Sequence, residues 1–188
     1  LAEVLTRYQL RSRLFLVPFG ELQRQVTLSV PGDLRVIIYR RFMLRIAERI
    51  ARDARAKALV TGDVIGQVAS QTLDNLAAAD SATRLPILRP LVGMDKEDII
   101  NRAREIGTYD ISATVQEYCD IVPEKPATSA DPRTLAYEEE KVEFDLPALL
   151  SQRRVLELRK LPVSELSLPD YEIDVIPPGA EVLDLRSL

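Results

Sequence analysis

The sequence predicts an α/β fold, a parallel sheet with flanking helices, followed by a helical C-terminal extension. Two observations predict it. Over about the first 110 residues, segments of helical period alternate with short apolar runs of strand length, which is typical of parallel sheets covered by helices. Further on, the charged segment Arg133–Leu161 has the composition of one or two helices.

The expected helices begin at the N-terminus. Leu1–Ser12 carries an apolar stripe of helical spacing, and Glu21–Val30 is a second helix ended by Pro31-Gly32. The longest helix runs to about Arg55 from Asp33, which is placed to cap it. Its apolar face is expected to hold Tyr39, Phe42, Met43, Ile46 and Ile50.

The expected strands are the apolar runs Leu14–Phe19, Lys57–Thr61 and Leu85–Leu91. A helix is expected from Gly66 onward. Another follows Asp95, which caps it, and ends at Gly107. Ligands of parallel sheets bind beyond the carboxyl ends of the strands. The loops after Val60 and Leu91 are therefore the expected ligand site.

Composition excludes several classes of protein. The net charge of −4 and the pI of about 5.1 do not suit a stand-alone nucleic-acid binder. The 188 residues include no histidine, which removes His-based triads and most zinc and iron sites, so no metal site is predicted. The single cysteine, Cys119, cannot form an internal disulfide and favours a reducing, cytoplasmic location. No apolar run reaches about 18 residues, so no membrane span is expected.

The stretch "ALVTGDVIGQVASQT" holds the first candidate binding residues. Gly62 directly follows an expected strand, and a glycine there lets the backbone approach a flat ligand such as a base or ribose. Gln71, on the expected helix, is placed to reach back with its amide. Thr61 and Asp63 are candidate local caps. From these residues alone, a plain strand-to-helix turn is the favoured interpretation.

Three stretches together resemble one known family. "ALVTGDVIGQVASQTLDNL", "LPILRPLVGMDKEDIINRAREIGTYD" and "EYCDIVPEKPAT" resemble the tRNA 4-thiouridine synthetases, tRNA sulfurtransferases also tied to thiamine thiazole synthesis. "YRRFMLRIAERIA" fits as well. The resemblance runs from about Leu14 to Thr128 and, more weakly, to Arg154. "EVLDLRSL" resembles the first strand of the rhodanese-like domain that ends longer members.

The resemblance implies an organisation and a reaction. Residues 1–128 would be the latter part of a PP-loop ATP-binding adenylating domain, of the adenine nucleotide alpha-hydrolase-like fold. Residues 129–180 would be a helical extension and linker, and residues 181–188 the start of the rhodanese-like domain. ATP, with Mg²⁺, would adenylate the C4 oxygen of uridine 8 in tRNA. Sulfur from a persulfide donor would then displace AMP.

The resemblance also assigns site residues. Arg40 matches the family's basic nucleotide-contacting position, and Gly62 and Gln71 match its other two contacts in this segment. Lys96 matches a lysine expected to face the phosphates. A cation in the first turn of a helix is unfavourable beside the dipole, so an anionic ligand explains Lys96 better than an ordinary surface role. For Arg40 the alternative is a solvated helix residue.

Cys119 matches a cysteine that, in long members, pairs with the persulfide-carrying rhodanese cysteine. The alternative is a buried structural thiol. The acidic neighbours Glu117 and Asp120 would raise the pKa of the thiol, which argues against a strongly activated thiolate.

Four arginines form a ridge along the longest helix: Arg41, Arg45, Arg49 and Arg52. The ridge is either a solvated face or a contact for tRNA phosphates or for a second subunit of a homodimer. The other partners implied by the resemblance are tRNA, held mainly by a region absent here, and a cysteine desulfurase as sulfur donor.

The sequence departs from the family's pattern at one motif. The pyrophosphate-binding "SGG.DS" loop is absent, since the chain has no Gly-Gly pair, and we expect the chain to be a piece that is inactive alone. Two alternatives stay open at this point. One is a PP-loop ligase or amidotransferase, and the other is a non-catalytic nucleotide-binding or interaction module.

Overall fold

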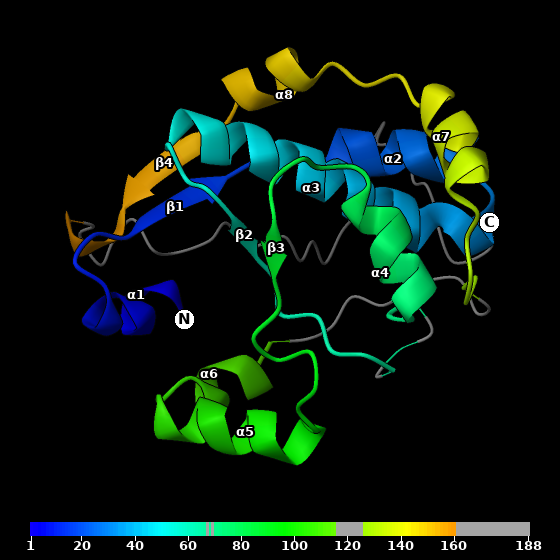
Figure 1. The fold of residues 1–188 in the computed structure, drawn as a ribbon. Coiled ribbons are helices and arrows are strands. Elements are labelled where there is room, and N and C mark those ends of the chain that lie inside the picture. The colour runs from blue at the N-terminus through cyan, green and yellow to red at the C-terminus, as the bar shows by residue number, and fades with distance from the viewer. Residues whose placement is uncertain (67, 69, 116–125, 161–188) are drawn as a thin grey trace, which may run out of the picture.

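The computed structural model describes residues 1–66, 68, 70–115 and 126–160 (Figure 1). Cys119, the end of the expected linker (residues 161–180) and the expected start of the rhodanese-like domain (residues 181–188) lie outside these residues. The described elements are, in order, α1 (Ala2–Leu5), η1 (Thr6–Tyr8), β1 (Arg13–Leu16), α2 (Gly20–Ser29), η2 (Gly32–Leu34), α3 (Arg35–Asp53), β2 (Leu59–Val60), α4 (Leu73–Asp80), β3 (Ile87–Leu88), α5 (Lys96–Glu105), α6 (Tyr109–Ala113), α7 (Pro132–Glu140), α8 (Leu146–Ser151), β4 (Arg154–Glu157) and η4 (Leu158–Lys160).

The long helix α3 organises the fold, with helices and both strand pairs arranged around it (Figure 1). One side of α3 contributes Tyr39, Phe42 and Ile46 to an apolar core shared with α2, α7 and α8. Its other side contributes Leu44 and Ala51 to a smaller cluster with β2 and α4. Burying apolar surface on both sides stabilises α3 far more than helix propensity does.

The predicted apolar face of this helix is largely confirmed. Tyr39, Phe42 and Ile46 are buried, and Ile50 packs against the same core. The prediction is wrong for Met43, which is 51% exposed. It lies one residue, about 100°, round the helix from Phe42, beyond the edge of the buried stripe.

The predicted parallel sheet is present as one short pair in the described part of the chain. β2 and β3 pair in parallel, with Leu59 opposite Ile87 and Val60 opposite Leu88. Leu59 is buried in the small cluster beneath α3, whereas Val60 is 67% exposed. The pair thus presents one apolar face to the helix, as the alternation of side chains in a strand requires.

The first apolar run does not join a parallel sheet, and here the expectation is wrong. β1 pairs antiparallel with β4, with Leu14 opposite Leu156. β4 lies in the charged segment in which one or two helices, but no strand, were expected. Four residues of strand in such a segment cannot be told from helix by periodicity, because their strand form depends on β1, far away in sequence. The segment was expected to hold one or two helices, and it holds two, α7 and α8.

Three helix boundaries differ from expectation. Asp33 makes no capping hydrogen bond to α3 and lies in η2 instead. The helix expected from Gly66 begins only at Leu73, because the Thr72 side chain accepts from the N–H of Asn75 and caps it there. At the N-terminus, the α-helix covers only Ala2–Leu5.

Helix α5 agrees with expectation at both ends. The Asp95 carboxylate accepts from the N–H of Asp98 at 2.8 Å. Gly107 has φ +74°, the left-handed conformation that ends many helices.

Candidate functional site

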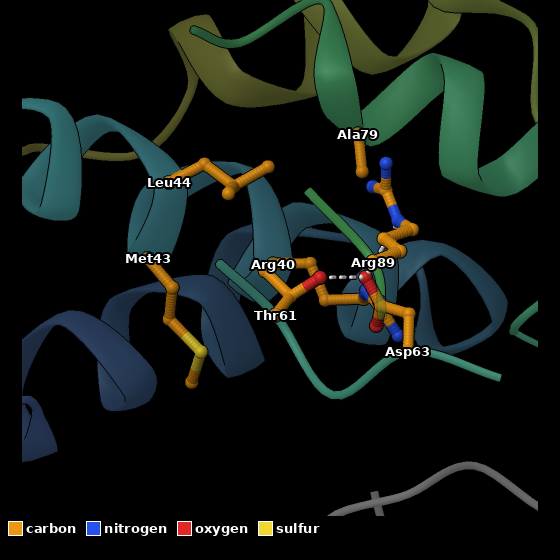
Figure 2. Close-up of a pocket in the computed structure, with 7 residues that line it drawn as sticks. All are labelled: Arg40, Met43, Leu44, Thr61, Asp63, Ala79 and Arg89. Atoms are coloured by element: carbon orange, nitrogen blue, oxygen red, sulfur yellow. Dashed lines mark hydrogen bonds and ion pairs between the residues drawn. The ribbon is translucent and has the colours of Figure 1, made fainter. Parts of the chain in front are cut away.

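A cluster of charged side chains lies at the carboxyl end of the parallel strand pair (Figure 2). Arg40 comes from α3, and Asp63 comes from the loop directly after β2. Arg40 Nη2 donates a hydrogen bond to Asp63 Oδ1. Thr61 Oγ1 donates to Asp63 Oδ2 at 2.7 Å, so these two residues bond to each other and do not act as helix caps. The cluster ties the long helix to the loop that the sequence predicts as the ligand site.

Two residues that sequence reasoning missed complete the cluster. Arg89 directly follows β3, and its Nε donates to Asp63 Oδ2 at 3.0 Å. Its Nη1 donates to Asp80 Oδ2, at the end of α4, at 2.9 Å. Arginine and aspartate therefore alternate in the order Arg40, Asp63, Arg89 and Asp80. The available signal was an arginine within one expected strand, Leu85–Leu91, and an aspartate shortly after the neighbouring expected strand.

The pKa of the Asp63 carboxyl lies below its ordinary value. Burial raises this pKa, but the hydrogen bond from Thr61 and the charges and hydrogen bonds of Arg40 and Arg89 outweigh burial. The pKa of Arg89 is raised, chiefly by its hydrogen bond to Asp80. Asp63 is therefore an anion at neutral pH, held by two cations.

These side chains line a pocket of about 290 Å³ (Figure 2). Met43, Leu44 and Ala79 form its apolar wall, and the charged cluster with Thr61 forms its polar wall. A concave site with a few convergent polar groups beside apolar surface suits a small ligand that has both a flat apolar part and polar substituents.

Gly62 lies between Thr61 and Asp63, at the edge of this cluster. It is exposed, and a Cβ built on it would meet no atom within 4 Å. The space above its backbone is therefore open for a ligand to approach. Its φ is not in the left-handed range, so open space, and not an unusual backbone conformation, distinguishes the position.

Gln71 lies in the loop before α4, not on the helix that was expected. Its backbone carbonyl accepts from the N–H of Gly66 at 3.1 Å, which closes the loop. Its side-chain Oε1 is buried without a hydrogen-bond partner among the described residues. Buried polar atoms are nearly always paired in folded proteins. This oxygen therefore lacks a hydrogen-bond donor, which a ligand in the loop could supply.

Lys96 is the first residue of α5 and is exposed. It lines a separate open hollow of about 530 Å³ that the loops after β2 and β3 form together: Val64, Ile65, Gly66, Val92, Gly93, Met94 and Asp95. Lys96 makes no ion pair with any residue that the structure describes. The structure thus places Lys96 at the predicted edge of the sheet, in a different hollow from Arg40.

The arginine ridge of α3 is occupied by contacts within the chain. Arg41 is buried and, with Arg45, contacts Glu139 of α7. Arg49 pairs with Asp53 on the same helix. Arg52 pairs in the same way with Glu48. Arg41 is therefore held inside the fold, whereas the side chains of the other three arginines are 41% to 62% exposed.

Two further findings concern metals and membranes. Among the described residues, no group of three or more His, Cys, Asp or Glu side chains is placed to hold a metal ion. Within the same residues, no helix is long and apolar enough to cross a bilayer.

The fold and the site together define the class. The chain is an α/β protein with a candidate ligand site, rich in charged groups, where the loops leave a parallel strand pair.

Comparisons with known proteins give the family. The family described as thiamine biosynthesis protein (ThiI) matches residues 1–144. The chain is 48% identical over 160 residues to a probable tRNA sulfurtransferase of Thermus thermophilus, covering 83% of this chain and 39% of that protein. It is 39% identical over 174 residues to a tRNA sulfurtransferase of Shewanella loihica, covering 91% and 36%. The chain belongs to the ThiI family.

One solved structure has a similar fold. It is a crystal structure of a 4-thiouridine synthetase–RNA complex with bound ATP. It matches with a TM-score of 0.77 and 42% identity, over 82% of this chain and 42% of that one. The chain therefore spans about two fifths of the length of the relatives it matches.

Proposed function

We propose that this chain is the latter part of the PP-loop ATP-binding domain of a tRNA sulfurtransferase. The whole protein would use ATP and a persulfide sulfur donor to convert uridine 8 of tRNA to 4-thiouridine, and its sulfur relay would also serve thiamine thiazole synthesis. The buried, unpartnered Oε1 of Gln71 in the loop after β2 carries the proposal, because it requires a donor that the described protein does not supply.

The residues present fit an adenine nucleotide. A ribose hydroxyl and the adenine amino group are both donors that would satisfy Gln71 Oε1. The open space over Gly62 admits the nucleotide to the backbone. Arg40 supplies guanidinium donors from α3 toward the same loop. The solved relative of similar fold has ATP bound.

ATP supplies the adenylyl group that makes a uridine carbonyl oxygen a good leaving group. In this proposal Lys96 faces the phosphates, where a compact ammonium stabilises developing negative charge. The described residues offer Mg²⁺ no cluster of ligands, so Mg²⁺ would be carried mainly by the phosphates themselves.

Partners of the whole protein are part of the same proposal. The whole protein would bind tRNA, mainly through a region absent here, as well as a cysteine desulfurase and a second copy in a homodimer. Cys119 is assigned to disulfide pairing with the cysteine that delivers the persulfide. The names of the relatives favour sulfur transfer over an amide-forming ligase or a non-catalytic module.

The direct test is ATP binding by the full-length protein that carries this sequence, measured by calorimetry. Arg40→Ala is expected to weaken binding by about 1–3 kcal/mol, the worth of a charged hydrogen bond. Arg49→Ala is the matched control, because Arg49 is an exposed arginine on the same helix, paired only to Asp53. Equal affinity in wild type and Arg40→Ala would remove Arg40 from the site.

The sulfur-transfer role is tested separately. Cys119→Ser in the full-length protein is expected to abolish 4-thiouridine in cellular tRNA while leaving ATP binding unchanged. Nucleoside analysis of tRNA from cells that carry only the variant measures this. Normal 4-thiouridine in those cells would end the assignment of Cys119.

A further inference from the structure

We propose that Asp63 and Arg89 are positioning residues, which hold Arg40 in the orientation that contacts the nucleotide. The inference rests on the proposed function, because it assumes that Arg40 meets ATP. Neither residue was a candidate from the sequence for this role. Figure 2 shows Arg40 and Arg89 converging on Asp63 from α3 and from the end of β3.

The first step concerns the donors of Arg40. Of the three guanidinium nitrogens of Arg40, only Nη2 donates a hydrogen bond to Asp63. Nε and Nη1 of Arg40 make no hydrogen bond to any residue that the structure describes, and the side chain remains 22% exposed. A guanidinium is a rigid, planar fork, so holding one nitrogen restricts the directions that the other two can take. Asp63 therefore orients Arg40 and leaves donors for a ligand.

The second step concerns how Asp63 itself is held. Its two carboxylate oxygens accept from different residues. Oδ1 accepts from Arg40, and Oδ2 accepts from both Thr61 and Arg89. The carboxylate is therefore fixed independently of Arg40. The side chain is only 10% exposed, so water competes weakly for either oxygen.

The third step concerns Arg89. Its two terminal nitrogens donate to the two oxygens of Asp80, the bidentate geometry that makes arginine–carboxylate pairs strong and directional. Asp80 is the last residue of α4, and Gln71 lies two residues before that helix begins. Through Arg89, the C-terminal end of α4 at Asp80 is therefore linked to Asp63, in the loop directly after β2.

Preorganisation is the physical gain. A free arginine side chain samples many rotamers, and ordering it during binding reduces affinity. An arginine already held by a buried carboxylate avoids that cost. If the chain of pairs only stabilised the fold, its loss would lower ATP affinity equally with or without Arg40.

The test is a double-mutant cycle on ATP affinity in the full-length protein. Asp63→Asn keeps the size of the side chain and removes its charge. Alone, it is expected to lower ATP affinity about three- to tenfold, the effect of one side chain ordered on binding. In the Arg40→Ala background it is expected to change affinity by less than about twofold, since no arginine remains to be positioned.

Arg89→Lys is the second variant, carried through the same cycle. Lysine keeps the charge but has no fork to bridge Asp63 and Asp80, so it is expected to behave as Asp63→Asn does. Arg89→Lys also keeps the inference testable if Asp63→Asn fails to fold. Unfolding midpoints of the variants show whether Asp63→Asn is folded.

The outcomes separate the two proposals. Loss of affinity in the single variants that vanishes in the Arg40→Ala background supports the positioning role. Unchanged affinity in both single variants, or an equal loss in both backgrounds, overturns it and leaves the proposed function intact. A wild-type protein that does not bind ATP overturns both.

Discussion

Arg41 of α3 and Glu139 of α7 form a buried ion pair in which Arg41 Nε lies 2.7 Å from Glu139 Oε1. Their side chains are 5% and 9% exposed. A second bond, from Arg41 Nη2 to Glu139 Oε2 at 3.0 Å, makes the pair bidentate, and Arg45 donates to the same carboxylate. One glutamate therefore attaches the helical extension to the central helix.

Glu139→Ala is expected to destabilise the protein by about 3–5 kcal/mol, because it leaves a buried arginine without its counter-charge. Urea unfolding of the full-length protein measures this. Glu140→Ala is the control, since the neighbouring Glu140 is exposed and makes no ion pair within the described residues. Similar unfolding midpoints for the two variants would contradict the role given to Glu139.

Asn75 joins the start of α4 to the segment that precedes α7. Its Nδ2 donates to the carbonyl of Ala127 at 2.7 Å, and its Oδ1 accepts from the N–H of Ala130 at 3.1 Å. Asn75 is 1% exposed. Asn75→Ala leaves both backbone groups unpaired, at a cost of about 1–3 kcal/mol for each buried group.

We therefore expect Asn75→Ala to unfold at clearly lower urea and to be cleaved sooner by a protease near residues 127–130. Asn101→Ala on the exposed face of α5 is the matched control and should resemble wild type. If Asn75→Ala were as resistant as that control, the bridge would contribute nothing.

Gly66 closes the loop that carries Gln71 and has φ +76°. A Cβ there would meet nothing within 4 Å, so the cost of Gly66→Ala is conformational only, about 1–2 kcal/mol. Gly93→Ala, in the same hollow but without positive φ, should cost less. Thermal unfolding compares the two, and an equal effect would mean that the loop relaxes to another conformation.

The lowered pKa of Asp63 predicts a pH dependence of stability. Its carboxylate contributes stability above the ordinary pKa of 3.8, and this contribution is lost as pH falls through the lower pKa of the folded state. The difference in stability between wild type and Asp63→Asn should be constant from about pH 7 to pH 5 and shrink below about pH 4. Unfolding midpoints across this range measure it, and a difference that grows in acid would reverse the assigned sign.

The sequence predicted local features better than distant ones. The period of α3 and the Asp95 cap depend on residues within a few positions of each other, and both are present. β4 depends on β1, and Arg89 depends on Asp63, so neither can be recognised from its own neighbourhood. One local feature was missed as well, since α4 begins at Leu73 behind the Thr72 cap and not at Gly66.

In the candidate site, too, the positions of single residues could be predicted from the sequence, but their contacts with distant residues could not. Arg40, Gly62 and Gln71 were assigned by resemblance, and the structure places all three around the loop after β2. What the sequence could not provide is the ion pairing of Arg40 and the burial of the Gln71 amide oxygen, since both require the packed fold.

The pairing of β1 with β4 also affects how the protein folds as it is synthesised. Leu14 and Leu156 pair across roughly 140 residues, which a ribosome adds at roughly 5–20 residues per second, taking on the order of ten seconds. During that interval the nascent β1 has an open hydrogen-bonding edge and no partner strand. An open edge can pair with other chains, so early binding by a chaperone would protect this segment of the growing polypeptide until β4 is made.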